Sequence, residues 1–377
     1  MRVRLRLKQI LDEHNDTGRG VIKKICDHTS LERHKVAAML NDRVQYLSLD
    51  ALSAICSYLM EHHGLSAAQL PGRLFALERE DFWSLVARRR SLEICFGVRS
   101  DVPHSTVSWV TTVDSDLYGV LLHELYGAGS LQIHEQPESL RQVHVSAFQT
   151  DLNPAHAEAE AAAARDEALS VHNRFHSIRG DRGLLCLGSV KSNVAIEAVV
   201  AGVFGTRPYV SEDNVAAPTD RKVPFFFRYR DDDVQPLSCH GGIQLSHSDS
   251  ADVPGIYFEG KKGRWQCCPC NEEEDAAFVF YSYRPPDGVL EAVLGGFSSR
   301  ATFALARALA DRDLAQQLWP PSFDQQHRQV GAFVIRLRFR KSGSQRRTEA
   351  DVLSTREKAA EMEVFPVPQE AFERRLR

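Results

Sequence analysis

Residues 184–205 read LLCLGSVKSNVAIEAVVAGVFG. The apolar residues before Gly188 predict a buried strand and those after Asn193 a buried helix, so the polar residues between them form a loop. Residues 290–309, LEAVLGGFSSRATFALARAL, repeat this order of strand, glycine-serine loop and helix. Two such units in one segment are typical of a layer in which helices cover a mainly parallel sheet. We therefore expect an α/β domain over residues 91–340.

Other segments of this domain fit the same architecture. Apolar runs predict further strands at 91–98, 142–148, 223–230, 276–285 and 330–340, and helical periodicity predicts helices at 116–127 and 154–178. The expected product is a mainly parallel sheet with helices on both faces.

The two glycine-serine loops resemble those of a known class of domains. The pattern GSxxSN at 188–193, followed about a hundred residues later by GGFSS at 295–299, is similar to Rossmann-like sensor domains found behind DNA-binding modules. Helix amino termini at the carboxyl edge of a parallel sheet attract anions, so we expect a small anionic or nucleotide effector here. The expected ligand-binding residues are Gly188, Ser189, Lys191, Ser192, Asn193, Gly295, Gly296, Ser298, Ser299 and Arg300. The alternative is that both loops are only tight turns and helix caps.

The first 76 residues predict a separate helical module. Helices are expected to begin near Val3, Val21, Leu31, Ser48 and Ser66. A tight turn at Thr29 and Ser30 joins the second helix to the third, and this geometry places one helix in the major groove of DNA. Residues 1–47 hold ten Lys or Arg against six acids, whereas the whole chain has a net charge of −4. A local basic surface on an acidic chain suits a DNA-binding module.

The run at 36–59, VAAMLNDRVQYLSLDALSAICSYL, and the order of five helices resemble the Cro and phage-repressor class of regulators, of the xenobiotic-response-element type. The resemblance implies a recognition helix over residues 31–40. A phosphate-contacting glutamine of the family is Ile22 here, so basic neighbours are expected to take its role. The expected DNA contacts are Arg19, Lys23, Lys24, Glu32, Arg33, His34, Lys35, Arg43 and Gln45. The alternative is a helical bundle that serves only protein contacts or dimerisation.

Four of the eight cysteines lie near one another in the sequence: Cys239, Cys267, Cys268 and Cys270. They supply enough soft ligands for a tetrahedral zinc, although CCPC is not the usual spacing of a zinc site. Two alternatives stay open. Vicinal thiols beside Lys261 and Arg264 could act as a redox sensor through a lowered pKa, or the cysteines are incidental on a surface hairpin.

A chain of 377 residues with 43% apolar and 25% charged residues predicts more than one globular domain. We expect a linker at 77–90 and a charged tail at 341–377 that packs weakly or exchanges onto a partner subunit. No apolar run is long enough for a membrane span and the first residues lack a signal peptide pattern, so a cytoplasmic protein without membrane contact is expected.

These features together predict a sequence-specific transcription regulator, a repressor, that binds double-stranded DNA as a homodimer because two recognition helices must meet two half-sites. Two alternatives remain. The chain could be an enzyme that acts on a nucleotide or nucleic acid and is targeted by its helical module, or a DNA-binding component of a defence system. No catalytic constellation stands out, and the acidic runs are typical of solvated loops.

Overall fold

The structure is a computed structural model that describes residues 2–16, 18, 20–41, 44, 46–68, 70–78, 81–99, 108–127, 139–147, 154–189, 191–210, 221–229, 245, 249–325, 327–339 and 359–376. The chain divides into two compact units, Met1–Glu80 and Asp81–Arg377. The boundary between the two units therefore falls within the expected linker at 77–90. The second half of this segment is not a linker, because it belongs to the larger unit.

The amino-terminal unit is mainly helical. Its elements are β1 Arg2–Leu5, α1 Leu7–Glu13, α2 Val21–Thr29, α3 Arg33–Leu40, α4 Leu49–His63, α5 Leu70–Leu74 and β2 Phe75–Glu78. The core gathers apolar side chains from all five helices, among them Leu7, Ile25, Val36, Tyr58 and Leu74. The first helix was expected from Val3, but residues 2–5 alternate in polarity and pair antiparallel with β2 instead.

The larger unit holds an eight-stranded sheet and a three-stranded sheet among its described residues. Its elements are α6 Phe82–Ala87, β3 Leu92–Val98, α7 Thr112–Gly127, β4 Leu140–Ser146, α9 Pro154–Ser177, β5 Arg182–Leu187, α10 Ala195–Phe204, β6 Phe225–Arg228, β7 Gly255–Glu259, β8 Trp265–Pro269, β9 Glu274–Arg284, β10 Val289–Gly296, α11 Ser299–Leu309, α12 Arg312–Gln317, β11 Phe323–Gln325, β12 Arg328–Arg338, β13 Glu361–Pro366 and α13 Gln369–Glu373.

The large sheet is mixed, which corrects the expectation of a mainly parallel one. Its order is β11-β12-β9-β10-β5-β3-β4, with β13 paired to β12. The strands β10, β5, β3 and β4 run parallel, whereas β9, β11, β12 and β13 pair antiparallel. The reason is the short turn between β9 and β10, where Gly288 has φ +66°, because so short a turn returns the chain antiparallel. The expected strand at 223–230 lies in the small sheet, as β6.

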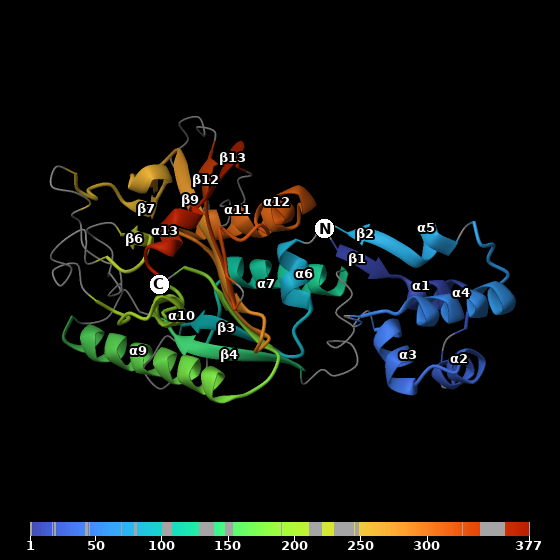
Figure 1. Cartoon of the computed structure of the whole chain (residues 1–377). Coiled ribbons are helices and arrows are strands. Elements are labelled where there is room, and N and C mark those ends of the chain that lie inside the picture. Colours follow the sequence, from blue (N-terminus) through green and yellow to red (C-terminus); the bar gives the residue numbers. More distant parts are fainter. Residues whose placement is uncertain are drawn as a thin grey trace. The chain divides into compact units, whose positions relative to one another are not determined.

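Helices cover both faces of the large sheet, as expected (Figure 1). One face packs against α9, α10 and α13 together with the small sheet. The opposite face packs against α6, α7, α11 and α12. The central strands are mainly apolar because both of their faces are buried, as in β5, where every residue is buried, whereas the edge strands β4 and β13 are partly exposed. Because β10, β5, β3 and β4 run parallel, the loops that follow them leave the sheet at the same edge.

The end of the expected carboxyl-terminal tail is part of the fold, which corrects the expectation that it packs weakly. Residues 361–366 form β13, which pairs with Phe333–Arg338 of β12. Phe372 of α13 is fully buried, and its ring stacks on Phe204 with centroids 6.1 Å apart. The charged residues 340–358 lie outside the described residues.

Among the described helices, none combines the length and the hydrophobicity that a crossing of the bilayer requires.

Candidate functional site

The turn between α2 and α3 brings two short helices close together in the amino-terminal unit. Ser30 takes the left-handed conformation, with φ 57°, and its N–H donates to the Cys26 carbonyl over 2.9 Å. The Thr29 hydroxyl donates to Ile25 O over 2.7 Å and accepts from the N–H of Leu31 over 3.3 Å. These bonds fix the turn with a serine at the position where glycine is the easiest residue to accommodate.

The expected base-reading residues lie on the exposed side of α3. Arg33, His34 and Lys35 are exposed, whereas Val36 and Met39 on the other side are buried in the core. The Glu32 carboxylate lies 3.3 Å from Lys35 Nζ and 3.2 Å from His34 Nε2. Glu32 therefore orients these two side chains in the free protein.

The expected phosphate contacts of α2 divide into two kinds. Lys23 is exposed, whereas Lys24 donates from Nζ to Asp16 Oδ2 over 2.9 Å. The Tyr58 hydroxyl donates to the same oxygen over 2.8 Å. Burial opposes ionisation of Asp16, but the bonds from Lys24 and Tyr58 outweigh it and lower the Asp16 pKa. The other expected contacts, Arg19, Arg43 and Gln45, lie outside the described residues.

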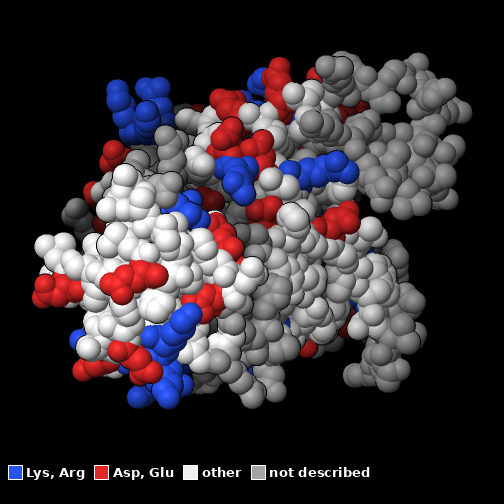
Figure 2. Space-filling model, turned by 90° about the vertical axis from the view of Figure 1, so that its right-hand side faces the viewer, with Lys and Arg blue, Asp and Glu red and all other residues white. Residues whose placement is uncertain are grey.

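Basic and acidic side chains are interspersed on the face of the molecule that Figure 2 draws, and the described residues on this face form no broad patch of one sign. Such a surface lacks the large basic field that binds polyanions without selection.

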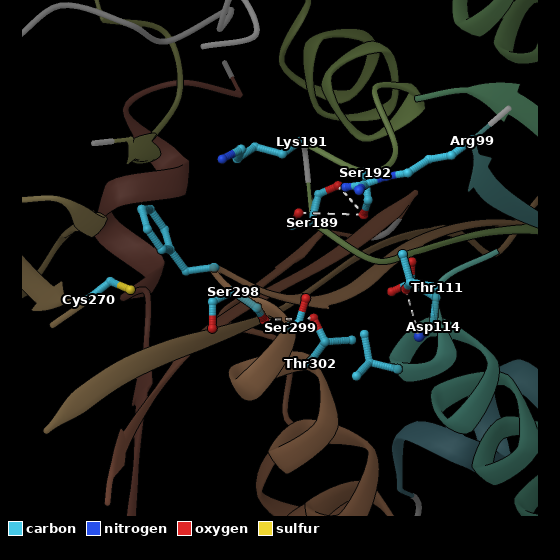
Figure 3. Close-up of a pocket in the computed structure, with 12 residues that line it drawn as sticks. Arg99, Thr111, Asp114, Ser189, Lys191, Ser192, Cys270, Ser298, Ser299 and Thr302 are labelled. Carbon is cyan, nitrogen blue, oxygen red and sulfur yellow. Dashed lines mark hydrogen bonds between the residues drawn. The ribbon is translucent and has the colours of Figure 1, made fainter. Parts of the chain in front are cut away.

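In the larger unit, the two glycine-serine loops meet at one cavity of about 200 Å³, as expected if both lie at the carboxyl edge of the parallel strands. Figure 3 shows Ser189 and Ser192 of the first loop across from Ser298, Ser299 and Thr302 of the second. We call this cavity the serine pocket. Its lining residues are Arg99, Thr111, Val113, Asp114, Ser189, Lys191, Ser192, Cys270, Phe297, Ser298, Ser299 and Thr302.

Glycines allow the loops to approach so closely. Gly188 has φ +102°, a conformation that residues with a Cβ rarely adopt. A Cβ on Gly295 would lie 2.1 Å from the Gly188 carbonyl oxygen. A Cβ on Gly97, near the end of β3, would lie 1.2 Å from the Ser192 carbonyl oxygen. The ends of β3 and β10 therefore pack closely against the backbone of the loop after β5.

Sequence reasoning missed two charged residues of the pocket, Arg99 directly after β3 and Asp114 in the first turn of α7. Asp114 is 2% exposed, and its Oδ2 atom finds no hydrogen-bond partner among the described residues. Burial raises the Asp114 pKa to about 6, against the opposing effects of Thr111 and Arg99. The Arg99 Nε atom is also buried without a described partner. The sequence did offer one indication of these residues. Because β3 is a parallel strand, the residues that follow it lie at the same edge of the sheet as the two glycine-serine loops.

Two expected ligand residues serve the protein's own structure. The fully buried Asn193 side chain donates to the carbonyls of Cys95 and Leu187 over 2.9 and 3.1 Å, and it accepts from the N–H of Ala195. Arg300 donates to the carbonyls of Asn271 and Glu272, each over 2.9 Å. Neither residue lines the serine pocket, and Gly188, Gly295 and Gly296 do not line it either. Their contact with an effector stays a prediction.

The amino terminus of α11 is already capped by a side chain, which corrects part of the reason given for an anion site, whereas the Val194 position at the start of α10 has no side-chain cap. The Ser298 hydroxyl accepts from the N–H groups of Arg300 and Ala301 at the start of α11. It also donates to Asp275. Positive charge at the pocket therefore comes mainly from Arg99 and Lys191 rather than from the N–H groups at the start of α11.

The three described cysteines of the expected zinc site do not converge on one point. Cys267 and Cys268 are consecutive in β8 and point to opposite faces of the small sheet. Cys268 and Cys270 belong to the main core, whereas Cys267 packs beside Tyr257 on the other face. Cys239 lies outside the described residues.

The pKa values of the two β8 thiols also argue against a redox sensor. Burial raises the Cys267 pKa to about 11 and the Cys268 pKa to about 12, opposite to the lowering that a reactive thiolate needs. Cys268 fills space in the main core, and Cys267 packs, partly buried, on the other face of the small sheet.

Comparisons of the sequence and the structure with protein families, curated proteins and solved structures find no match.

Proposed function

We propose that the chain is a sequence-specific DNA-binding regulator whose amino-terminal unit reads DNA and whose larger unit binds a small anion. The observation that carries the first half is the exposed Arg33, His34 and Lys35 on a helix anchored by Val36 and Met39. Arg and Lys donate to guanine, and His donates or accepts, so this face has the chemistry of a base-reading helix. Two copies acting as a dimer would meet two half-sites.

The exposed face of α3 favours recognition over protein docking. Docking surfaces gain affinity from buried aromatic and aliphatic side chains, whereas three consecutive exposed residues of α3 are basic or imidazole groups. Glu32, which lies beside Lys35, provides an acceptor for cytosine N4 and so adds selectivity.

The DNA claim is tested by mixing the purified full chain with a random library of duplexes at physiological salt and sequencing the bound fraction. We expect one enriched motif with two related half-sites spaced by about one helical turn. Enrichment without a motif, or no retention of duplex DNA, would contradict the proposal.

The second half of the proposal assigns a small phosphate-bearing molecule to the serine pocket. Arg99 and Lys191 supply charge for the anion, and the hydroxyls of Ser189 and Ser299 supply donors. The Oδ2 atom of Asp114, which has no hydrogen-bond partner among the described residues, offers an acceptor for a hydroxyl or amine of the same ligand. A cavity of about 200 Å³ is smaller than the roughly 300–1,000 Å³ of drug-sized sites, which favours a phosphate with one sugar-sized group.

Ser189→Trp should fill the serine pocket and abolish the ligand response. We expect inorganic phosphate or a pentose phosphate to raise the melting temperature of the unmodified chain but not of Ser189→Trp. Ser177→Trp, at an exposed serine at the end of α9, is the control and should respond like the unmodified chain. The ligand claim fails if neither probe stabilises the unmodified chain, or if both tryptophan variants respond equally.

A second candidate function is an enzyme that acts on the bound phosphate ester. The observation that favours it is Asp114, whose pKa of about 6 suits a general acid or base near neutral pH. Turnover of a pentose phosphate that disappears in Asp114→Asn would favour this function, whereas binding without turnover favours a sensor.

A further inference from the structure

Two histidines and a glutamate converge at the other end of the large sheet from the serine pocket. His172 and His176 lie one turn apart on α9, and Glu291 lies in the first half of β10. His172 Nε2 and His176 Nε2 lie 3.2 and 3.0 Å from Glu291 Oε1 and 3.1 Å from each other. The three ligand atoms thus form a nearly equilateral triangle.

Protons cannot satisfy all three sides of this triangle. Each Nε2 atom either carries a hydrogen or offers a lone pair. If both histidines donate to Glu291, two N–H groups face each other across 3.1 Å. If one histidine accepts from the other, it has no Nε2 hydrogen left for the carboxylate. One side of the triangle therefore always lacks a hydrogen bond.

A metal ion satisfies all three atoms at once. An ion bound to each atom at about 2.1 Å fits about 1 Å above the plane of the triangle, with ligand–metal–ligand angles of roughly 95°. Two imidazoles and a carboxylate on one side of an ion leave the other positions open for water, and this ligand set suits first-row transition metals.

The surrounding chain is shaped to hold these side chains. Glu291 is 3% exposed on the sheet face that α9 and α10 cover. Gly202 of α10 leaves room for the His172 ring, because a Cβ there would lie 2.7 Å from the ring. Ser282, opposite Glu291 in β9, is buried, and its hydroxyl has no hydrogen-bond partner among the described residues. The His176 side chain is 30% exposed, which gives an ion a path from solvent.

One neighbour competes with the metal. Arg284 Nη2 lies 3.3 Å from His176 Nδ1, and a donated hydrogen bond there keeps the proton on Nε2. Metal binding through Nε2 puts a hydrogen on Nδ1, which an arginine cannot accept. Arg284 must therefore turn away when an ion binds.

We propose that His172, His176 and Glu291 bind one divalent transition-metal ion, with zinc as the reference ion. The site ties α9 to β10 and is separate from both the serine pocket and the cysteines of β8. It stands independently of the proposed DNA and anion binding.

The test is equilibrium dialysis of the metal-free full chain against Zn²⁺, followed by elemental analysis. We expect close to one ion per chain, and at least tenfold weaker binding by His176→Ala and by Glu291→Gln. Zinc can also meet the paired His28 and His62 of the amino-terminal unit, so His62→Ala is the control and should bind like the unmodified chain. Co²⁺ adds a second measurement, because its visible absorption changes when imidazole enters its coordination shell.

Arg284→Ala distinguishes a metal site from a hydrogen-bonded cluster. Removing the competitor should strengthen zinc binding, while a purely structural cluster would only lose stability. The proposal is overturned if the unmodified chain binds no zinc, if His176→Ala binds as tightly as the unmodified chain, or if zinc is lost in His62→Ala instead.

Discussion

Burial disfavours the ionised form of the Asp114 carboxyl. Burial raises its pKa to about 6, above the value of about 3.9 in an unfolded chain. The folded state therefore holds this proton more tightly than the unfolded state. The resulting stability is fully present below about pH 4 and is lost as the pH rises through about 6, a difference on the order of 3 kcal/mol.

Asp114→Asn should remove this pH dependence, because an amide stays neutral. We expect the variant to match the unmodified chain near pH 4 and to exceed its free energy of unfolding by about 1 to 3 kcal/mol at pH 8. Urea denaturation at both values measures it, with Asp116→Asn on the same helix as the control. An unmodified chain that is the more stable of the two at pH 8 would contradict the assignment.

Single residues also show which features of the site could be predicted from the sequence and which could not. Ser189 and Ser192 line the pocket, as their position in a loop after a parallel strand suggests, and their role in ligand binding stays a prediction. The structural roles of Asn193 and Arg300 could not be predicted. The sequence does not show whether the partners of a polar loop residue are ligand atoms or backbone carbonyls. Cys267 and Cys268 were open to a better prediction, because neighbours in a strand always point to opposite faces.

Among the elements, β3 and the loop after β5 fit together only because Gly97 has no side chain. Gly97→Ala places a Cβ 1.2 Å from the Ser192 carbonyl oxygen, so β3 or the loop must move. We expect a loss of about 3 kcal/mol or more in the free energy of unfolding. Thermal unfolding followed by circular dichroism measures it.

Gly119→Ala is the matched control for that substitution, since a Cβ at this exposed position in α7 meets nothing within 4 Å. It should stabilise the chain by about 0.5 to 1 kcal/mol through helix propensity. Equal effects of the two substitutions would show that the close contact beneath the serine pocket is wrong.

Periodicity predicted both strand-loop-helix units and the helices on each face, since these depend on residues close in sequence. It did not predict that β9 and β12 pair antiparallel over ten residue pairs. Strand order depends on contacts between distant residues, and an apolar run looks the same in a parallel and an antiparallel sheet.

In the whole molecule, the carboxyl-terminal segment closes one face of the large unit. Phe372→Ala removes a fully buried ring that packs on Phe204 and Phe323, and should lower the free energy of unfolding by about 3 to 5 kcal/mol. Met362→Ala, at a 46% exposed side chain of β13, is the control and should change it by less than about 1 kcal/mol. Chemical denaturation compares the two, and an unchanged stability of Phe372→Ala would restore the expectation of a weakly packed tail.

The central claim is that α3 reads DNA, and fluorescence anisotropy with a duplex carrying the selected motif tests it most directly. The double variant Arg33→Ala, Lys35→Ala should lose about 2 kcal/mol or more of binding free energy, roughly thirtyfold in Kd. Lys261→Ala, Lys262→Ala removes the same charge from two exposed lysines of the larger unit and should bind like the unmodified chain. If the α3 double variant binds the motif as tightly as the unmodified chain at physiological salt, α3 does not read the DNA.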